Sequence, residues 1–129
     1  MKVVPMDLGV CGVEQLMYAG TVKFNSTGVA TGFKLCDVPA NTLITKAVAV
    51  VKTAFDAGTT NVLTIGTNDD VNDLLGSSDI TEGTAGAYSK LAFVECSAKK
   101  AVKAKFTQTG TDATAGVADV YLGVVRIPG

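Results

Sequence analysis

The pattern of apolar and polar positions along the chain predicts strands, most clearly over residues 43–55. This stretch reads LITKAVAVVKTAF and carries apolar side chains at both odd and even positions. Successive side chains of a strand point to opposite faces, so both faces in the middle of this strand would be apolar. An antiparallel strand with one face in water alternates instead. We therefore expect a cover on each face, the domain core on one and a neighbouring subunit on the other.

The last predicted strand, residues 117–127, has the same two-faced character in the sequence VADVYLGVVRI. Three strand–turn–strand units are expected before this last strand. They pair 16–24 with 29–35, 43–55 with 61–67, and 91–97 with 101–108. In residues 101–108 the pattern places Val102, Ala104 and Phe106 inward and Lys103 and Lys105 outward.

Seven or eight strands separated by turns are typical of a β-sandwich or a jelly roll. The chain of 129 residues holds 18 Val and 16 Thr against 9 Leu, a balance that favours strands over helices. We predict a single all-β domain, a β-sandwich of jelly-roll type, over residues 16–129.

An extended N-terminal arm is expected over residues 1–15. Its apolar residues are too numerous for free exposure to water, and Pro5 keeps the segment from being a central strand. We expect the arm to pack onto its own domain or onto a neighbour.

The longest polar segment, residues 68–86, reads NDDVNDLLGSSDITEGTAG, and the spacing of Val71, Leu74 and Leu75 suggests one short helical turn inside it. Asp69, Asp70 and Asp73 carry the oxygen ligands that Ca²⁺ prefers, but the spacing is not that of an EF-hand loop. The favoured interpretation is a turn whose side chains bind nearby backbone amides, so no metal or cofactor is predicted.

The composition argues against catalysis and against nucleic-acid binding. Histidine is absent, which removes the commonest general base and metal ligand. The carboxylates that could pair as in a glycosidase all lie in one Gly-rich loop, so we expect no enzyme; they are Asp69, Asp70, Asp73, Asp79 and Glu82. A net charge of −1 gives no surplus of cations for phosphates, so no nucleic-acid partner is expected.

Lysines gather on and beside residues 101–108, at Lys99, Lys100, Lys103 and Lys105. No aromatic side chain that could stack on a base shares their face, so a solvated strand face is favoured, with contact to an acidic protein surface as the alternative. A carbohydrate-binding sandwich is a further alternative, although sugar sites usually present exposed aromatics and this chain has no Trp.

The three cysteines, Cys11, Cys36 and Cys96, are odd in number and widely spaced. Cys96 follows Ala92 and Val94 on one strand face, which predicts a buried, reduced thiol. The first residues do not form a secretory signal, and no apolar run approaches the ~20 residues that span a bilayer. We therefore expect synthesis in a reducing cytoplasm and no membrane partner.

Residues 51–60, VKTAFDAGTT, followed by 62–67, VLTIGT, resemble a segment of small virion proteins of tailed bacteriophages and prophages. The resemblance extends to the Asp-rich loop, to Gly86-Ala87-Tyr88 and to a final strand near Tyr121-Leu122-Gly123-Val124-Val125. It covers roughly residues 43–88 and the last strand, and leaves the first forty residues outside.

The resemblance implies a structural protein of the virion, as a capsid decoration (cement), head-fibre or tail component. The expected function is decoration of the capsid exterior, where copies of the chain, with a trimer as the leading expectation, bind one another and the major capsid protein. A tail or baseplate component is the alternative. The residues expected at the subunit or capsid interface are Val3, Val4, Met6, Leu8, Val48, Val50, Val120, Leu122 and Val124.

Overall fold

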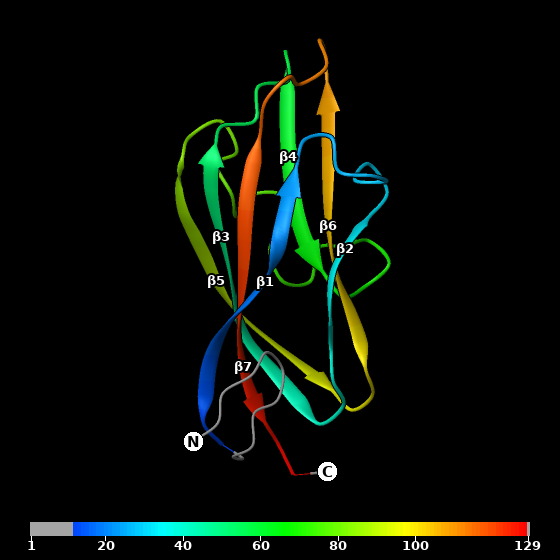
Figure 1. Ribbon diagram of the computed structural model, residues 1–129, viewed down its shortest axis with the longest axis vertical. Coiled ribbons are helices and arrows are strands. Elements are labelled where there is room, and N and C mark those ends of the chain that lie inside the picture. Colours follow the sequence, from blue (N-terminus) through cyan, green and yellow to red (C-terminus); the bar gives the residue numbers. More distant parts are fainter. Residues whose placement is uncertain (1–11, 129) are drawn as a thin grey trace.

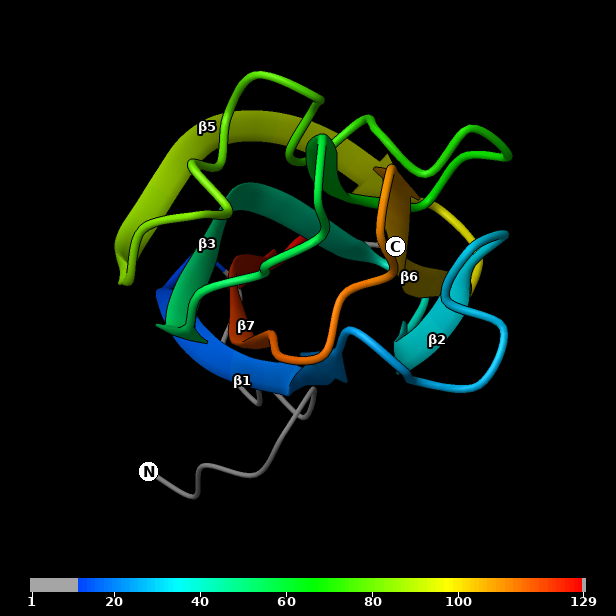
Figure 2. The same ribbon diagram turned by 90° about the horizontal axis from the view of Figure 1, so that it is seen from above.

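The computed structural model describes residues 12–128, which form seven strands packed as two antiparallel sheets (Figure 1). The strands are β1 (Glu14–Lys23), β2 (Phe33–Val38), β3 (Thr42–Thr53), β4 (Thr60–Gly66), β5 (Gly86–Cys96), β6 (Lys100–Thr109) and β7 (Val117–Arg126). They run along the long axis of the molecule, and the two sheets enclose the core between them (Figure 2). The predicted single-domain, all-β sandwich is confirmed.

The sheets have the strand orders β1-β7-β3-β5 and β2-β6-β4. Odd-numbered strands therefore form one sheet and even-numbered strands the other, so every connection along the chain crosses from one layer to the other. The three expected strand–turn–strand pairings are wrong for this reason. β1 pairs with β7, β3 pairs with β5 and β7, and β6 pairs with β2 and β4.

The physical cause of that error lies in what a turn signal specifies. Asn25-Ser26-Thr27-Gly28 reverses the chain, but a strand with one apolar face can return beside its predecessor or in the opposite sheet with equal local cost. Long-range contacts decide between these. The amide of Phe24 donates to the carbonyl of Gly116 at 3.0 Å, and the amide of Phe106 donates to the carbonyl of Val29 at 2.8 Å. Both bonds tie the connection to strands far away in sequence.

The inner face of each sheet supplies the core. In β6 the side chains of Val102, Ala104 and Phe106 are buried while the two lysines between them point outward, as predicted. Phe106 packs against Phe55 with ring centroids 4.8 Å apart, which joins the two layers near the end of β3.

A bulge in β3 changes which of its side chains face the core. Ile44 pairs with Val124, but Lys46 pairs with Gly123, so Thr45 is an extra residue relative to β7. Ile44 is consequently buried, whereas Lys46 lies on the outer face with Val48. Strict alternation would place Ile44 and Lys46 on the same face, and the bulge puts them on opposite faces.

The segment after β4 covers the edge of the three-stranded sheet. Leu75 forms a bridge with Ile65, and the Glu82 carboxylate accepts a hydrogen bond from the amide of Leu63 at 2.8 Å. The residues expected to form a helical turn, Val71, Leu74 and Leu75, are buried here in turns and bends without a helix. Leu74, Leu75 and Ile80 of this segment therefore belong to the core, while polar residues such as Asp69 and Asp70 stay exposed.

The jelly-roll topology and the bounds of the N-terminal arm are two finer parts of the sequence prediction. A jelly roll in the strict sense has eight strands, and the described residues form seven, so this topology stays a prediction. β1 begins at Glu14, so residues 14 and 15 belong to the sheet and not to the arm. Residues 12 and 13 of the predicted arm are exposed just before β1, and residues 1–11 lie outside the described residues.

Burial of Glu82 provides a test of how the sheet edge is closed. The residue is 7 % exposed, and this burial raises the pKa of its carboxyl above the ordinary value. A raised pKa in the folded state means that ionisation costs stability above the ordinary pKa, and that the cost disappears as the pH falls below it. Glu82→Gln keeps an acceptor for the amide of Leu63 and removes the charge. We expect it to raise the melting temperature at pH 7 by about 2–5 °C.

Calorimetry between pH 4 and pH 8 checks this expectation, with Asp112→Asn, at an exposed loop carboxylate, as the control. The gain for Glu82→Gln should shrink toward pH 4, because the raised pKa lets the folded wild type bind the proton as the pH falls and so lose the cost of ionisation. A lower melting temperature for Glu82→Gln at pH 7 would show that the ionised carboxylate stabilises the fold.

Candidate functional site

The outer face of the four-stranded sheet carries the large apolar side chains that the described residues expose. Leu16, Tyr18, Leu91 and Phe93 are 57 %, 54 %, 67 % and 69 % exposed, and Val13, just before β1, is 42 % exposed. Leu16 and Tyr18 lie on β1, and Leu91 and Phe93 lie on β5, so the two outer strands of one sheet hold them. A monomeric protein rarely leaves so many large apolar groups on one face in water.

The strand registers place these side chains in rows across the sheet. One row runs Leu16, Gly123, Lys46 and Leu91, and the next runs Tyr18, Tyr121, Val48 and Ser89. Neighbours in a row point to the same face, so the outer side chains of all four strands form one surface. We call it the outer face of the four-stranded sheet.

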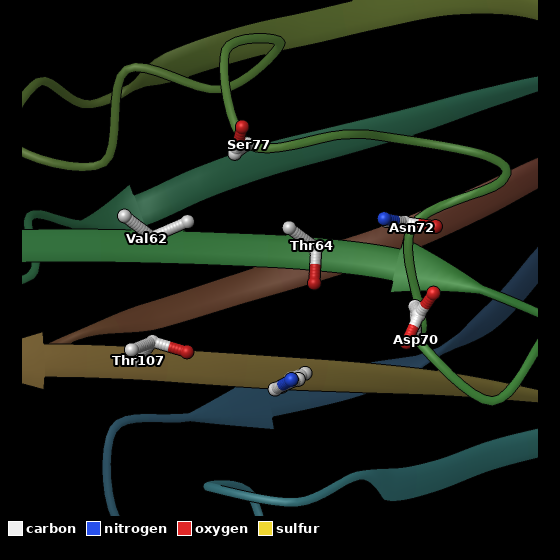
Figure 3. A pocket seen from close by; sticks show the side chains of 7 residues that line it. Val62, Thr64, Asp70, Asn72, Ser77 and Thr107 are labelled. Atoms are coloured by element: carbon white, nitrogen blue, oxygen red, sulfur yellow. The ribbon is translucent and has the colours of Figure 1, made fainter.

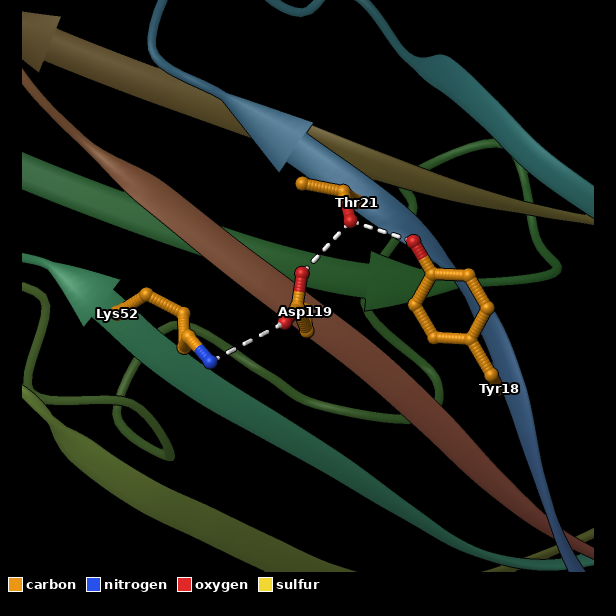
Figure 4. A network of polar contacts seen from close by, with 4 residues as sticks. All are labelled: Tyr18, Thr21, Lys52 and Asp119. Atoms are coloured by element: carbon orange, nitrogen blue, oxygen red, sulfur yellow. Dashed lines mark hydrogen bonds and ion pairs between the residues drawn. The ribbon is translucent and has the colours of Figure 1, made fainter.

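Contacts at the centre of this face hold Tyr18 in place. Its ring meets that of Tyr121 edge to face, with centroids 5.6 Å apart and planes at 61°. Its hydroxyl lies 2.5 Å from the Thr21 hydroxyl, which donates to the Asp119 carboxylate at 2.6 Å (Figure 4). The Lys52 ammonium lies 3.9 Å from the same carboxylate. The aromatic pair is thus a preorganised contact surface, which lowers the entropy cost of binding.

In the row that contains Leu16 and Leu91, the absence of a side chain at Gly123 lets the side chains of Lys46 and Glu14 lie close to the backbone of β7. A Cβ atom at this position would lie 2.7 Å from Cγ of Lys46 and 3.1 Å from a carboxylate oxygen of Glu14. Glu14 also accepts a hydrogen bond from the hydroxyl of Thr45, the bulge residue. The apolar stem of Lys46 therefore lies flat on the sheet and extends the apolar surface.

The predicted interface residues divide into three groups. Val48 and Val50 are half-buried and lie on the outer face. Val120, Leu122 and Val124 are fully buried on the core side of β7, so their side chains have no surface to offer a partner, and this part of the assignment is corrected. Val3, Val4, Met6 and Leu8 lie outside the described residues.

Sequence reasoning missed the four most exposed apolar residues of the face. The alternation of side chains along β1 and β5 could have indicated that these four residues share a face. Leu16 and Tyr18 flank the buried Met17, and Leu91 and Phe93 flank the half-buried Ala92. Both sets of alternating residues are apolar, so the sequence alone did not show which set faces the core.

A second surface feature is an open hollow of about 310 Å³ between the 68–79 segment and the outer face of β4 and β6 (Figure 3). Its lining is mostly polar: Val62, Thr64, Asp70, Asn72, Ser77, Lys105 and Thr107. None of these side chains is aromatic, so the hollow offers no stacking platform for a sugar ring or a base.

The carboxylates of the acidic segment bind nearby polar groups of their own chain. Asp73 accepts hydrogen bonds from the amide and the hydroxyl of Thr67 at 2.6 and 2.5 Å. Asp79 accepts from the amide of Gly76 at 2.6 Å and lies 3.3 Å from the Lys90 ammonium. Within residues 12–128, no three acidic or cysteine side chains gather as metal ligands.

The two described cysteines are free thiols. Cys96 is fully buried, which confirms the prediction for this residue. Cys36 is half-buried, and burial together with the neighbouring Asp37 raises the pKa of its thiol to about 11. A thiol with this pKa is almost entirely protonated at neutral pH and therefore a poor nucleophile. Among the described residues, no helix is long and apolar enough to span a membrane.

Comparison with known proteins gives matches in structure only. No protein-family model and no curated protein matches the chain. A chain of the Cyanophage Pam1 capsid asymmetric unit superposes with a TM-score of 0.68 at 16 % identity, covering 99 % of this chain and 94 % of that one.

Two further phage capsids contain similar chains. A chain of the acid-stable capsid of Helicobacter pylori bacteriophage KHP30 has a TM-score of 0.59 at 19 % identity, covering 93 % of this chain and 97 % of its own. A chain of the capsid of Ralstonia phage GP4 has a TM-score of 0.57 at 17 % identity, with 100 % and 92 % covered. At these identities the likeness establishes a shared fold over nearly the whole length of each chain.

The internal bonds of Asp73 and Asp79 lead to an expectation about metal removal. These carboxylates already have partners within the chain, so we expect them to bind a cation weakly. A ligand stabilises the folded state only when it is present well above its dissociation constant, so a weakly bound cation should add little to stability. We expect EDTA to shift the melting temperature by no more than about 1–2 °C. A fall of about ten degrees that Ca²⁺ restores would contradict this, and would make Asp69, Asp70 and Asp73 the first residues to substitute.

Proposed function

We propose that this chain is a structural protein of a tailed-phage virion, and more specifically a decoration protein that binds the outside of the head. The observation that carries the proposal is the fold shared over nearly the full length with chains of three phage capsids. Because each match covers more than nine-tenths of both chains, it concerns the whole domain and not a common sub-motif.

The surface of the molecule supports a binding role. Such a protein acts by burying apolar surface against its neighbours, at roughly 25 cal/mol for each Å² removed from water. The outer face of the four-stranded sheet offers that surface, with Leu91 and Phe93 more than half exposed. The proposed partners are copies of the chain, expected as a trimer, and the major capsid protein. The proposed role is not enzymatic and needs no cofactor.

Quantitative mass spectrometry of purified virions tests the proposal, with the major capsid protein as the internal standard. Decoration of the head predicts hundreds of copies in each particle, lost together when decorated heads are stripped to bare shells. A handful of copies that co-purify with detached tails would support the tail or baseplate alternative. Absence from the particle would reject a virion role.

The arm provides a prediction of its own. Residues 2–10 precede β1 and contain the apolar positions Val3, Val4, Met6 and Leu8, which Pro5 prevents from pairing fully in a sheet. Deleting residues 2–10 should leave the melting temperature within about 2 °C of the wild type and weaken binding to the capsid or between subunits. Circular dichroism and capsid co-sedimentation measure the two effects. A deletion variant that fails to fold would assign the arm to the core.

A further inference from the structure

We infer that the outer face of the four-stranded sheet binds the same face of a second copy, with the strands of the two copies antiparallel across a two-fold axis. The order of charges along this face is the reason for choosing a second copy of the chain as the binding partner. The contact goes beyond the virion role proposed above and does not depend on it.

The charges on this face are antisymmetric along the strands. At one end, where β7 begins, lie Lys23, opposite Val117, and Lys52, which a second register shift leaves between Val51 and Thr53 and whose ammonium group points back toward Asp119. At the other end, where β1 begins, lie the carboxylates of Glu14 and Glu95. All four residues are exposed, so one end is positive and the other is negative.

The inner rows repeat the pattern with opposite sign. Asp119 lies one row in from the positive end, level with Val50, and Lys46 lies one row in from the negative end, level with Gly123. The middle row contains Tyr18, Tyr121, Val48 and Ser89 and carries no charge. From end to end the order is therefore positive, negative, neutral, positive, negative.

A two-fold axis across the strands, through the middle row, inverts this order in the second copy. Lys52 then approaches the row of Glu95 of the partner copy, and Asp119 approaches the row of Lys46. Sheets stack face to face about 10 Å apart, a gap that these long side chains can bridge. Stacking with the strands parallel would instead set like charges against each other, which costs affinity.

The positions of the aromatic side chains agree with the same two-fold axis. The edge-to-face pair of Tyr18 and Tyr121 lies in the row through which the axis passes, so the aromatic rings of both copies meet at the centre. Aromatic anchors at the centre with charges toward the ends are the usual anatomy of a protein interface. The ion pairs within one chain are long, 3.9 Å for Lys52–Asp119 and 4.0 Å for Lys46–Glu14, so the two ammonium groups can turn toward a partner, while hydrogen bonds from Thr21 and Thr45 hold the two carboxylates in place. A two-fold contact joins two copies, whether they are single chains or members of two neighbouring trimers.

Charge reversal and its rescue test the contact on the isolated full chain. Lys52→Glu places a carboxylate opposite Glu95 of the second copy, and Glu95→Lys places an ammonium opposite Lys52. Each reversal occurs twice in a two-fold contact, so each single variant should raise the dissociation constant of self-association about tenfold or more. The double variant Lys52→Glu/Glu95→Lys restores opposite charges and should return to within about threefold of the wild type. Lys103→Glu, a reversal on the outer face of the three-stranded sheet, is the matched control and should change nothing.

Sedimentation velocity over a concentration series gives the dissociation constants, and thermal melting checks that every variant is folded. Leu91→Ser/Phe93→Ser provides a second route that needs no charge change, and it should abolish association because both side chains are exposed in the single chain. The inference is overturned by a wild type that stays monomeric up to about 100 µM, well above the micromolar range of ordinary specific complexes. It is equally overturned by a double variant no better than the single variants, or by an effect of Lys103→Glu as large as that of Lys52→Glu.

Discussion

The four-stranded sheet has to keep apolar side chains on both of its faces away from water, and the rest of the structure depends on this constraint. Its inner face packs against the three-stranded sheet, and Val120, Leu122 and Val124 are completely buried there. Nothing in the described chain covers the outer face, where Leu91 and Phe93 remain exposed. Residues 12–128 contain no further strand or helix that could form another layer, so we expect the cover to come from outside the described fold.

The edge strand β4 of the three-stranded sheet is covered by residues of its own chain. An unpaired sheet edge invites pairing with other chains. At β4 the chain uses Leu75 as a one-residue bridge and the carboxylates of Glu82 and Asp73 as acceptors for the amides of Leu63 and Thr67. The cost is a buried carboxyl whose pKa is raised. Association is thereby directed away from this edge, and the outer face of the other sheet is the accessible apolar surface.

The sequence was sufficient for the class of fold and for the central strands, because the run of apolar residues over 43–55 and the alternation over 101–108 are both local information. It was insufficient for pairing, because the turn at Asn25-Ser26-Thr27-Gly28 is compatible with a return in either layer. Face assignment failed where both faces are apolar. In β7 the residues at even positions form the core, and the choice between them and Tyr121 depends on the partner strands. The bulge at Thr45 has no sequence signal that separates it from a regular strand.

Hydroxyl-radical footprinting tests most directly whether the outer face is covered by protein in the assembled state. Side-chain oxidation of Tyr18, Leu91 and Phe93 is compared between a dilute sample and one at high concentration, with Phe24 and Phe33, which pack against the core, as internal references. The account predicts that oxidation of Tyr18, Leu91 and Phe93 falls severalfold on assembly while that of the two references stays constant. Equal oxidation of all five residues in both samples would contradict it, because the outer face would then remain in water.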